Sequence, residues 1–328
     1  MGKIVNFTSN PSSASAELSA SASGASGLRA DRLDAIFSAA RSKNAKTALV
    51  SMWARRVIVF GGATLTALIL GSLIGYILVM GVPHLTPSLF EWNYTTQNVS
   101  LMPALINTLV MAAVALLLCV PIGIGCAIYL VEYAPRGSKF VAAVRVTAET
   151  LQGIPSIVYG LFGMLFFVTA LGWNLSILAG AFTLAIMCLP VVMRTTEEAL
   201  LAVPDSYREG GYGLGAGRLR TVFHCVLPSA VPGILGGVIL SLGRCVGEVA
   251  ALLFTAGTIA SIPEFQAGIS AMFDSGRTLA VHMYILASEG LHINETYATA
   301  VVLLGVVVAL NLLTGFIVKK MNRSMENE

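Results

Sequence analysis

The sequence predicts an all-α membrane protein with six transmembrane helices. Of its 328 residues, 56% are hydrophobic and only 11% are charged, and the mean hydropathy is +0.80. Soluble domains carry about 25% charged residues, which keep their surfaces dispersed in water. Disordered chains need low hydrophobicity and high net charge. The composition therefore excludes both a soluble globular protein and a disordered one.

Long apolar runs predict where the chain crosses the bilayer. About 20 apolar residues are needed to cross about 30 Å of hydrocarbon as a helix. The runs are apolar on all sides and do not alternate, which favours helices over a barrel. Pro121, Pro155 and Pro190 interrupt three runs, so we expect kinked helices. The predicted spans are about 57–80, 103–130, 146–171, 175–193, 229–255 and 298–318.

Pairs of glycines four residues apart predict close helix packing. Gly71 and Gly75 form one such pair in the first span, and the fifth span has two more. Small residues at this spacing let membrane helices approach closely, although glycine is also common in membrane helices without such a role. We expect a packing seam in the fifth span, at the pairs Gly233/Gly237 and Gly243/Gly247.

The few charges predict the orientation of the chain. Lys and Arg occur before the first span, between the second and third, after the fourth and after the sixth. In the alternate loops, 81–102, 171–175 and 256–297, Arg277 is the only Lys or Arg. Cytoplasmic loops are the ones that carry excess Lys and Arg, so both termini are predicted to be cytoplasmic.

The five cysteines form no CxxC pair and mostly lie in apolar runs, which indicates a role in packing rather than in a disulfide or zinc site.

The sequence divides into a tail, 1–54, and a transmembrane domain, 55–322. Residues 8–27 are rich in Ser, Ala and Gly and are predicted to be disordered. Residues 28–46 suit an amphipathic helix that lies on the membrane or on a partner, or that has no role. The external loop, 256–297, contains a largely apolar stretch, 269–286. This stretch either forms an outer gate that meets a substrate-binding protein or merely caps the bundle.

The longest cytoplasmic connection, 194–228, predicts a docking element. Pro204 suits the first turn of a helix, with Asp205 and Glu209 near its positive end. The glycines from 213 to 217 then predict a turn, and a second short helix is expected over 218–225. The glycine pattern is not a phosphate-binding loop, because no strand precedes it and no Gly-Lys-Ser/Thr follows. We therefore expect no cofactor on this chain and no ATP hydrolysis by it.

The same connection resembles the EAA loop of ABC importer permeases. Its residues 209–228 read EGG-x3-G-x9-C-x-LP, against the family pattern EAA-x3-G-x9-I-x-LP. In that family the loop docks in a cleft of a separate ATPase subunit. The resemblance assigns coupling to the ATPase to Arg208, Glu209, Gly210, Gly211, Gly215, Leu227 and Pro228.

Three further segments resemble the PstA-type permeases of phosphate importers. These are GIPSIVYG at 153–160, RTTE at 194–197 with VP at 203–204, and GE at 247–248 followed by ALLFT at 251–255. The resemblance implies a type I (MetI-like) permease bundle in a bacterial or archaeal inner membrane. It also implies alternating access driven by ATP and Mg²⁺ on a partner. The implied partners are a PstC-like permease, a PstB-like ATPase dimer, a PstS-like phosphate-binding protein and membrane lipids, with no nucleic acid.

Two charges, Arg244 and Glu248, lie within the predicted fifth span. A charge at this depth costs at least about 2.5–3.5 kcal/mol, so it is not expected to face lipid. A spacing of four residues places both on one helix face, where they could form a structural ion pair. Alternatively, Arg244 lines the substrate pathway and donates two hydrogen bonds to phosphate, while Glu248 keeps the anion from being trapped. The resemblance favours this second interpretation.

Other polar residues receive simpler interpretations. Glu149 and Gln152 are expected at the membrane interface, and Arg194 and Glu197 at the base of the cytoplasmic loop. His282 and His292 lack the spacing of metal ligands, which indicates a surface or packing role. Two other functions stay open. A permease for molybdate or sulfate would keep the loop but lack the charged pair, and a secondary transporter would need no ATPase dock.

Overall fold

The computed structural model describes residues 52–53, 55–135, 137–263 and 265–326. The predictions for the tail therefore fall almost wholly outside the described residues. The chain divides into two compact units, Met1–Ile74 and Gly75–Glu328. The described part of the first unit belongs to an apolar helix, Arg55–His84, which is long enough to span a membrane. Its apolar side chains are exposed, as lipid contact requires.

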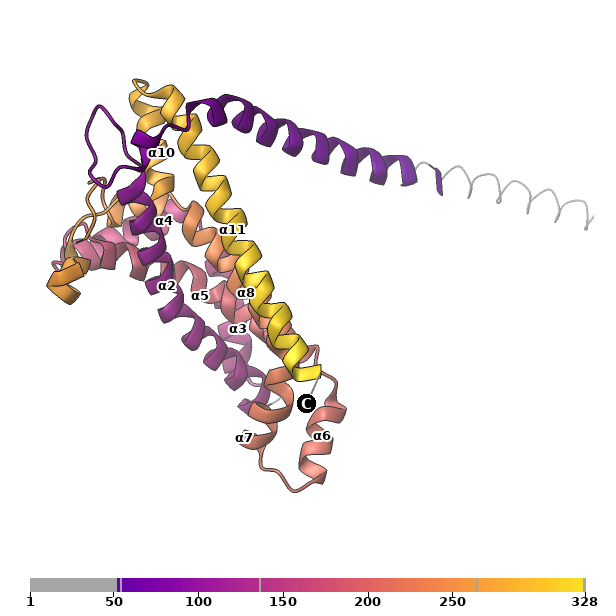
Figure 1. The fold of residues 1–328 in the computed structure, drawn as a ribbon. Helices are drawn as coiled ribbons and strands as arrows, with labels where there is room; N and C mark the ends of the chain where they lie inside the picture. The colour runs from indigo at the N-terminus through magenta and orange to yellow at the C-terminus, as the bar shows by residue number, and fades with distance from the viewer. Residues whose placement is uncertain (1–51, 54, 136, 264, 327–328) are drawn as a thin grey trace, which may run out of the picture. The chain divides into compact units, whose positions relative to one another are not determined.

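Four long helices make up most of the second unit (Figure 1). They are α2 (Met102–Ile128), α5 (Ile177–Leu201), α8 (Leu227–Gly247) and α11 (Ile293–Glu326). The helix α5 packs against both α2 and α8, and its Leu184, Cys188 and Val192 are fully buried. Five helices are long and apolar enough to cross a membrane, or six if one broken pair counts as a span. No strand occurs among the described residues, so the predicted all-α class is confirmed.

The predicted third span is not one helix. The chain forms α3 (Lys139–Gly153) and then α4 (Ser156–Gly163), which continues through a wide turn to Ala170. The two parts are bent by 100° because Ile154 and Pro155 are extended, with ψ of 130° and 142°. A proline disfavours helical geometry in the residue before it. By contrast, Pro121 and Pro190 lie inside the continuous helices α2 and α5.

The helix in the region of the predicted fifth span begins and ends at lower residue numbers than predicted. The short helix α7 (Arg218–Thr221) continues through a wide turn into α8, so that one apolar helix runs over Arg218–Gly247. The chain leaves the helix at Glu248, which is extended, and a separate helix, α9 (Ala250–Thr255), follows. The predicted continuation of this span to residue 255 is therefore wrong.

One of the two predicted glycine seams is present. A Cβ at Gly233 would come within 2.6 Å of the Cβ of Ala199, and one at Gly237 would overlap Thr195. Both neighbours belong to α5, so α8 approaches α5 closely here. A Cβ at Gly243 or at Gly247 would meet nothing within 4 Å. That second pair is not a seam within the described chain.

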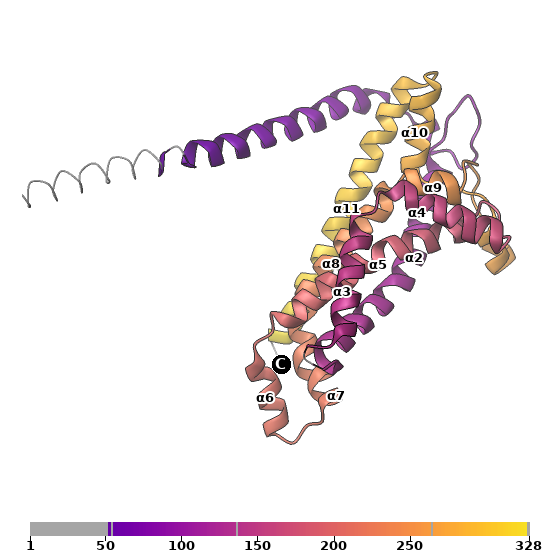
Figure 2. The ribbon, with the colours of Figure 1, turned by 180° about the vertical axis from the view of Figure 1, so that it is seen from behind.

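The segment between α9 and α11 folds at the opposite end of α5 from α6 (Asp205–Gly213). It contains a short irregular helix, Phe265–Phe273, and then α10 (Leu279–Glu289). The segment is joined to the start of α5, because Ile177 donates its N–H to the Asp274 carbonyl at 3.0 Å. Figure 2 shows α10 at one end of this unit and α6 with α7 at the other.

Candidate functional site

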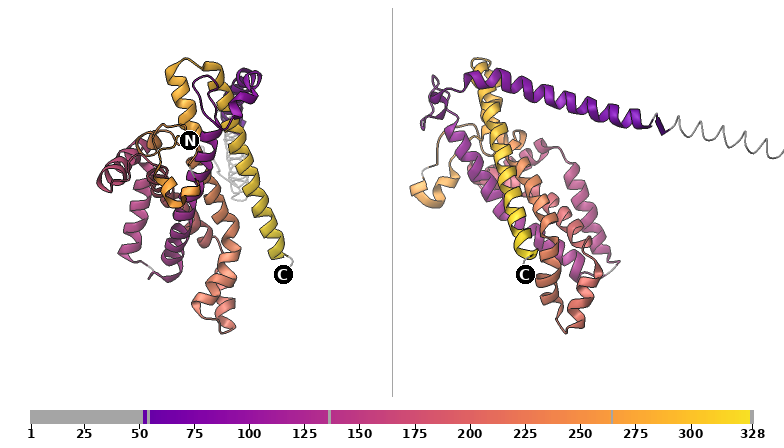
Figure 3. Two further views of the ribbon diagram at one scale, coloured as in Figure 1. Left: turned by 60° about the vertical axis from the view of Figure 1, so that its left-hand side comes forward. Right: turned by 45° about the vertical axis from the view of Figure 1, so that its right-hand side comes forward.

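The connection predicted to dock on the cytoplasmic side forms a helical hairpin of α6 and α7 (Figure 3). Pro204 is extended and ends the preceding turn, and Asp205 stands in the first turn of α6, at its positive end. Gly215 has a φ of +81°, a left-handed conformation that glycine adopts without steric cost. The predicted helix–turn–helix is confirmed. Its second helix does not stop before Pro228 but continues into α8.

The hairpin closes on itself through a glycine. Gly211 is buried, and a Cβ at this position would come within 2.7 Å of Thr221 on α7. The absence of a side chain therefore lets α6 and α7 approach closely. This is a packing role for one of the glycines that replace alanines of the family pattern.

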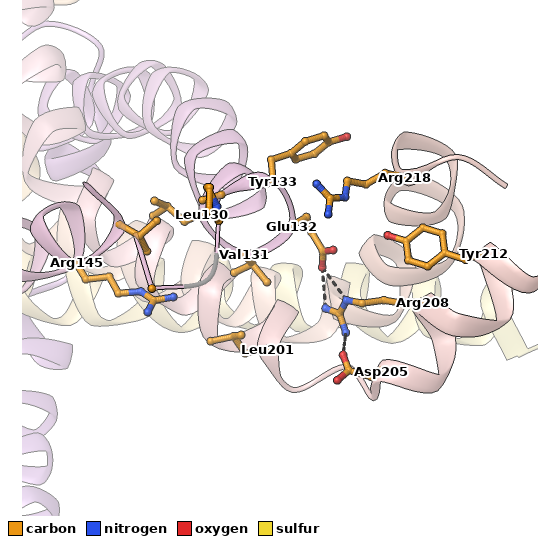
Figure 4. A pocket seen from close by; sticks show the side chains of 14 residues that line it. Leu130, Val131, Glu132, Tyr133, Arg145, Leu201, Asp205, Arg208, Tyr212 and Arg218 are labelled. Carbon is orange, nitrogen blue, oxygen red and sulfur yellow. Dashed lines mark hydrogen bonds and ion pairs between the residues drawn. The ribbon is translucent and has the colours of Figure 1, made fainter. Parts of the chain in front are cut away.

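Arg208 fastens α6 to the end of α2 (Figure 4). Its Nε and Nη2 atoms donate to Oε1 of Glu132 at 3.0 and 2.7 Å, and its Nη1 donates to Asp205 at 3.2 Å. Further bonds of 2.9 Å reach the carbonyls of Leu200 and Val203 at the end of α5. The bonds to Glu132 raise the pKa of Arg208, so this guanidinium is charged at any physiological pH.

A cavity of about 830 Å³ lies beside this anchor. The ends of α2, α5 and α6, the start of α3 and Arg218 of α7 line it (Figure 4). Arg218 stands over the Tyr133 ring, with 5.7 Å from its Cζ atom to the ring centroid. The cavity is therefore lined by both charges of the Arg208–Glu132 pair and by two further arginines, Arg145 and Arg218.

The outer face of the hairpin is exposed and partly apolar. Glu209 and Gly210 are exposed, and the side chains of Leu214 and Leu219 are 91% and 64% exposed. Leu227 and Pro228 are half-buried at the start of α8. This face of the hairpin thus presents the Glu209 carboxylate, a glycine and two leucines, all exposed in the described chain.

A second ionic network joins α3 to α5 behind the hairpin. Arg145 donates to the buried Glu197 at 2.5 Å. Arg194 lies 3.6 Å from Glu197 and 3.2 Å from Glu149. Gln152 donates to the Pro190 carbonyl at 3.0 Å. Arg194 and Glu197 therefore lie at the base of the loop, as predicted, and Glu149 is a partner within this network.

The predicted pair within the membrane is not an ion pair. Arg244 lies in the last turn of α8, whereas Glu248 follows the helix end. The Glu248 carboxylate accepts the Ala251 N–H at 3.3 Å and so caps α9. Arg244 forms no ion pair within 4.0 Å among the described residues. It lines an open hollow of about 390 Å³ with apolar residues of α5 and α8 and with Asn311 of α11.

The structure thus places five of the seven predicted coupling residues on α6 and the turn after it and the other two, Leu227 and Pro228, at the start of α8. It separates the predicted charged pair. Sequence reasoning missed Glu132, the buried carboxylate that holds Arg208. A signal was present, because Glu132 is the only acidic residue in the apolar run that forms α2 and the turn after it. Its partner lies 76 residues away, and nothing in the sequence pattern pairs the two.

Residues 119–327 match the family described as binding-protein-dependent transport system inner membrane component. The matched region contains the hairpin, Arg244 and the ion network of α3 and α5. The chain belongs to this family. It is an ABC importer permease subunit and a multi-pass membrane protein.

Several curated relatives are permeases. The chain is 35% identical over 241 residues to the probable ABC transporter permease protein YqgI of Bacillus subtilis, covering 70% of this chain and 81% of that one. It is 43% identical over 159 residues to the phosphate transport system permease protein PstA 1 of Mycobacterium tuberculosis H37Rv, covering 48% and 51%. The phosphate permease PstC of Xylella fastidiosa is 29% identical over 243 residues, covering 66% and 72%.

Solved structures confirm the fold. A chain of the MetNI methionine ABC transporter, in an inward-facing conformation, aligns with a TM-score of 0.55 and 21% identity, covering 67% of this chain and 95% of that one. A chain of a bacterial alginate ABC transporter aligns with a TM-score of 0.54 and 15% identity, covering 78% and 94%. The predicted MetI-like permease bundle is therefore confirmed.

Proposed function

We propose that this permease subunit imports inorganic phosphate, together with a second permease subunit, and that its α6–α7 hairpin couples it to a separate ATPase. The relatives named PstA 1 and PstC support phosphate as the substrate. The observation that carries the proposal is the guanidinium of Arg244, which has no ion-pair partner among the described residues and lines the hollow among α5, α8 and α11.

Arg244 has the chemistry that an anion pathway needs. A guanidinium can donate two parallel hydrogen bonds to a phosphate. Glu248 does not neutralise it as an i,i+4 partner, because its carboxylate caps α9 instead. Buried charge within a membrane is costly and marks substrate pathways. The sequence predicts that Glu248 keeps phosphate from being trapped at Arg244. The proximity of the two residues in the sequence is the only observation that supports this prediction.

The hairpin has the form that coupling needs. Its exposed face presents Glu209, Gly210 and Leu214 to a partner, while Arg208 transmits its position to the ends of α2 and α5. A pull on α6 would therefore act on two helices of the bundle. In the proposed cycle an ATPase dimer with ATP and Mg²⁺ moves the hairpin, and a binding protein delivers phosphate from outside.

Phosphate uptake by cells that carry Arg244→Gln tests the substrate pathway. We expect the initial rate to fall about tenfold or more, since a charge-assisted bidentate contact is worth at least about 1.4 kcal/mol. Lys319→Gln, which removes an exposed charge from α11, is the matched control. Normal phosphate uptake by an assembled Arg244→Gln complex would contradict the proposal, as would uptake of molybdate or sulfate in place of phosphate.

A further inference from the structure

Arg277 is a buried cation at the opposite end of the bundle from the hairpin. It lies two residues before the start of α10, and only 4% of its surface is exposed. Its N–H donates to the Ile259 carbonyl at 3.0 Å, and its carbonyl accepts from Nδ2 of Asn107 at 3.3 Å. Its backbone is thus fixed between α2 and the loop that follows α9. It is also the only Lys or Arg in the loops predicted to face outside.

The guanidinium of Arg277 lacks a counter-charge among the described residues. Its Nε and Nη2 atoms are buried and have no hydrogen-bond partner, and no carboxylate of the described residues lies within 4.0 Å of it. These two nitrogens form one edge of the guanidinium, the edge that can donate two parallel hydrogen bonds to an oxyanion. A buried ion without a partner costs several kcal/mol.

An aromatic ring is the one partner that the guanidinium has within the described chain. Its Cζ atom lies 4.4 Å from the centroid of the Tyr94 ring. A cation–π contact contributes about 2 kcal/mol at a desolvated site, which is less than the cost of burying the charge. The ring can stabilise Arg277 only in part, so an anion is needed to complete the site.

The loop that carries Tyr94 is held in one conformation. Val99 has a φ of +47°, which is a strained conformation for a β-branched residue. Asn98 donates to Glu91 at 2.7 Å and to the Asn93 carbonyl at 2.9 Å, and so braces the loop. The Glu91 carboxylate is engaged by this bond. The loop therefore supplies a fixed ring rather than a counter-ion.

Two neighbouring polar groups are also buried. The Oδ1 atom of Asn107 has no donor, and the His282 ring meets the Val99 backbone without a hydrogen bond of full geometry. The His282 ring packs edge-on against Tyr94, at 6.1 Å between centroids. Burial and the positive charge of Arg277 lower the pKa of His282 to about 3, so the ring is neutral at physiological pH. A neutral imidazole adds one donor and one acceptor.

We propose that the Arg277 cluster, formed by Arg277, Tyr94, Asn107 and His282, binds hydrogen phosphate at the outer end of the pathway before it reaches Arg244. The choice of phosphate rests on the proposed function. Hydrogen phosphate fits because it has oxygens for the guanidinium edge and an O–H for an acceptor such as Asn107. Sulfate carries no proton at neutral pH. A buried water could satisfy single hydrogen bonds but would leave the charge uncompensated.

The test is the thermal unfolding of the purified complex, without binding protein, in sodium phosphate, sodium sulfate or sodium chloride at equal ionic strength. We expect saturating phosphate to raise the unfolding midpoint by about 3 °C or more over chloride, because a ligand that binds only the folded state stabilises it. The phosphate-dependent shift should vanish in Arg277→Gln. It should require at least about tenfold more phosphate in Arg277→Lys, which keeps the charge but loses the bidentate edge.

Two controls keep the result interpretable. Lys319→Gln removes one exposed charge and should retain the full phosphate shift. If Arg277→Gln does not fold, the Arg277→Lys variant alone decides the question. The inference is overturned if phosphate does not stabilise the wild type, or if Arg277→Lys responds as the wild type does.

Failure of this inference is distinguishable from failure of the proposed function. Phosphate uptake that depends on Arg244, in a complex that phosphate does not stabilise through Arg277, would overturn the inference alone. A complex that sulfate stabilises through Arg277 as strongly as phosphate, and that does not import phosphate, would overturn the proposed substrate and the selectivity of the site.

Discussion

At the scale of single residues, Arg208 belongs to a motif predicted to contact a partner, but its side chain binds residues of its own chain. The motif predicts a residue that meets the ATPase. In the structure its guanidinium donates to Glu132 of the turn after α2 and to carbonyls at the end of α5. Arg208 positions the hairpin, whereas Glu209, the next residue, is exposed. Contact with a partner is therefore a prediction for Glu209 rather than for Arg208.

Replacing Arg208 should loosen α6 without unfolding the bundle. Arg208→Ala leaves the Glu132 carboxylate buried and unpaired, which costs about 2–3 kcal/mol after an allowance for partial exposure of the pair. Amide hydrogen exchange of α6 should accelerate about 30-fold or more, while that of α5 stays unchanged. Asp205→Asn is the control, because the Asp205 side chain is 75% exposed. Equal exchange in the two variants would contradict the anchoring role.

For Glu248, the partner predicted from residue spacing is wrong. A spacing of four residues predicts a pair with Arg244 only if the helix continues through both residues. The helix ends at Gly247, and the carboxylate caps α9 instead. Residue spacing could identify two charges at membrane depth, but it could not predict the break between them.

At the scale of elements, prolines and glycines have different effects in different surroundings. Pro121 and Pro190 stay within the continuous helices α2 and α5, which pack against each other. Pro155 ends one helix and begins another at 100° to it. Gly160, just beyond it, is so close to Ala251 of α9 that a Cβ would come within 2.8 Å of the Ala251 Cα atom. The contacts of α4 with α9 therefore hold the bent arrangement.

The α5–α8 seam can be tested with two adjacent glycines. Gly237→Ala places a Cβ against Thr195 and should destabilise by about 1–3 kcal/mol, as overpacking does. The thermal midpoint of the purified protein should fall by about 3–10 °C. Gly236→Ala adds a methyl group where nothing lies within 4 Å. It should leave the midpoint unchanged or raise it, and an equal loss in both variants would rule out the seam.

At the scale of the whole molecule, the described charges concentrate at the two ends of the second unit. One end holds the Arg208–Glu132 pair and the network around Glu197. The other holds Arg277, which has no counter-ion in the described part of the chain, and Arg244 lies within the long helix between them. For an anion transporter, this order predicts entry at Arg277, passage near Arg244 and coupling at the hairpin.

Copurification tests whether the α6–α7 hairpin binds the ATPase. The double variant Glu209→Lys, Gly215→Asp reverses an exposed charge on α6 and strains a turn whose φ is +81°. We expect the permease to be recovered from the membrane without its ATPase. Glu295→Lys, at the start of α11 and outside the hairpin, reverses one charge and should retain the ATPase. Retention of the ATPase and of transport in the double variant would refute the docking role.

The sequence by itself determined the membrane class, most span positions and the hairpin. These follow from composition, from the length of apolar runs and from turn residues such as Gly215, all of which act locally. Only the tertiary structure decided that the third span is broken, that Arg208 binds Glu132 and that Arg277 is buried with no counter-charge among the residues described. The physical reason is that desolvation and pairing depend on which distant segments meet, and residue spacing along the chain does not contain that information.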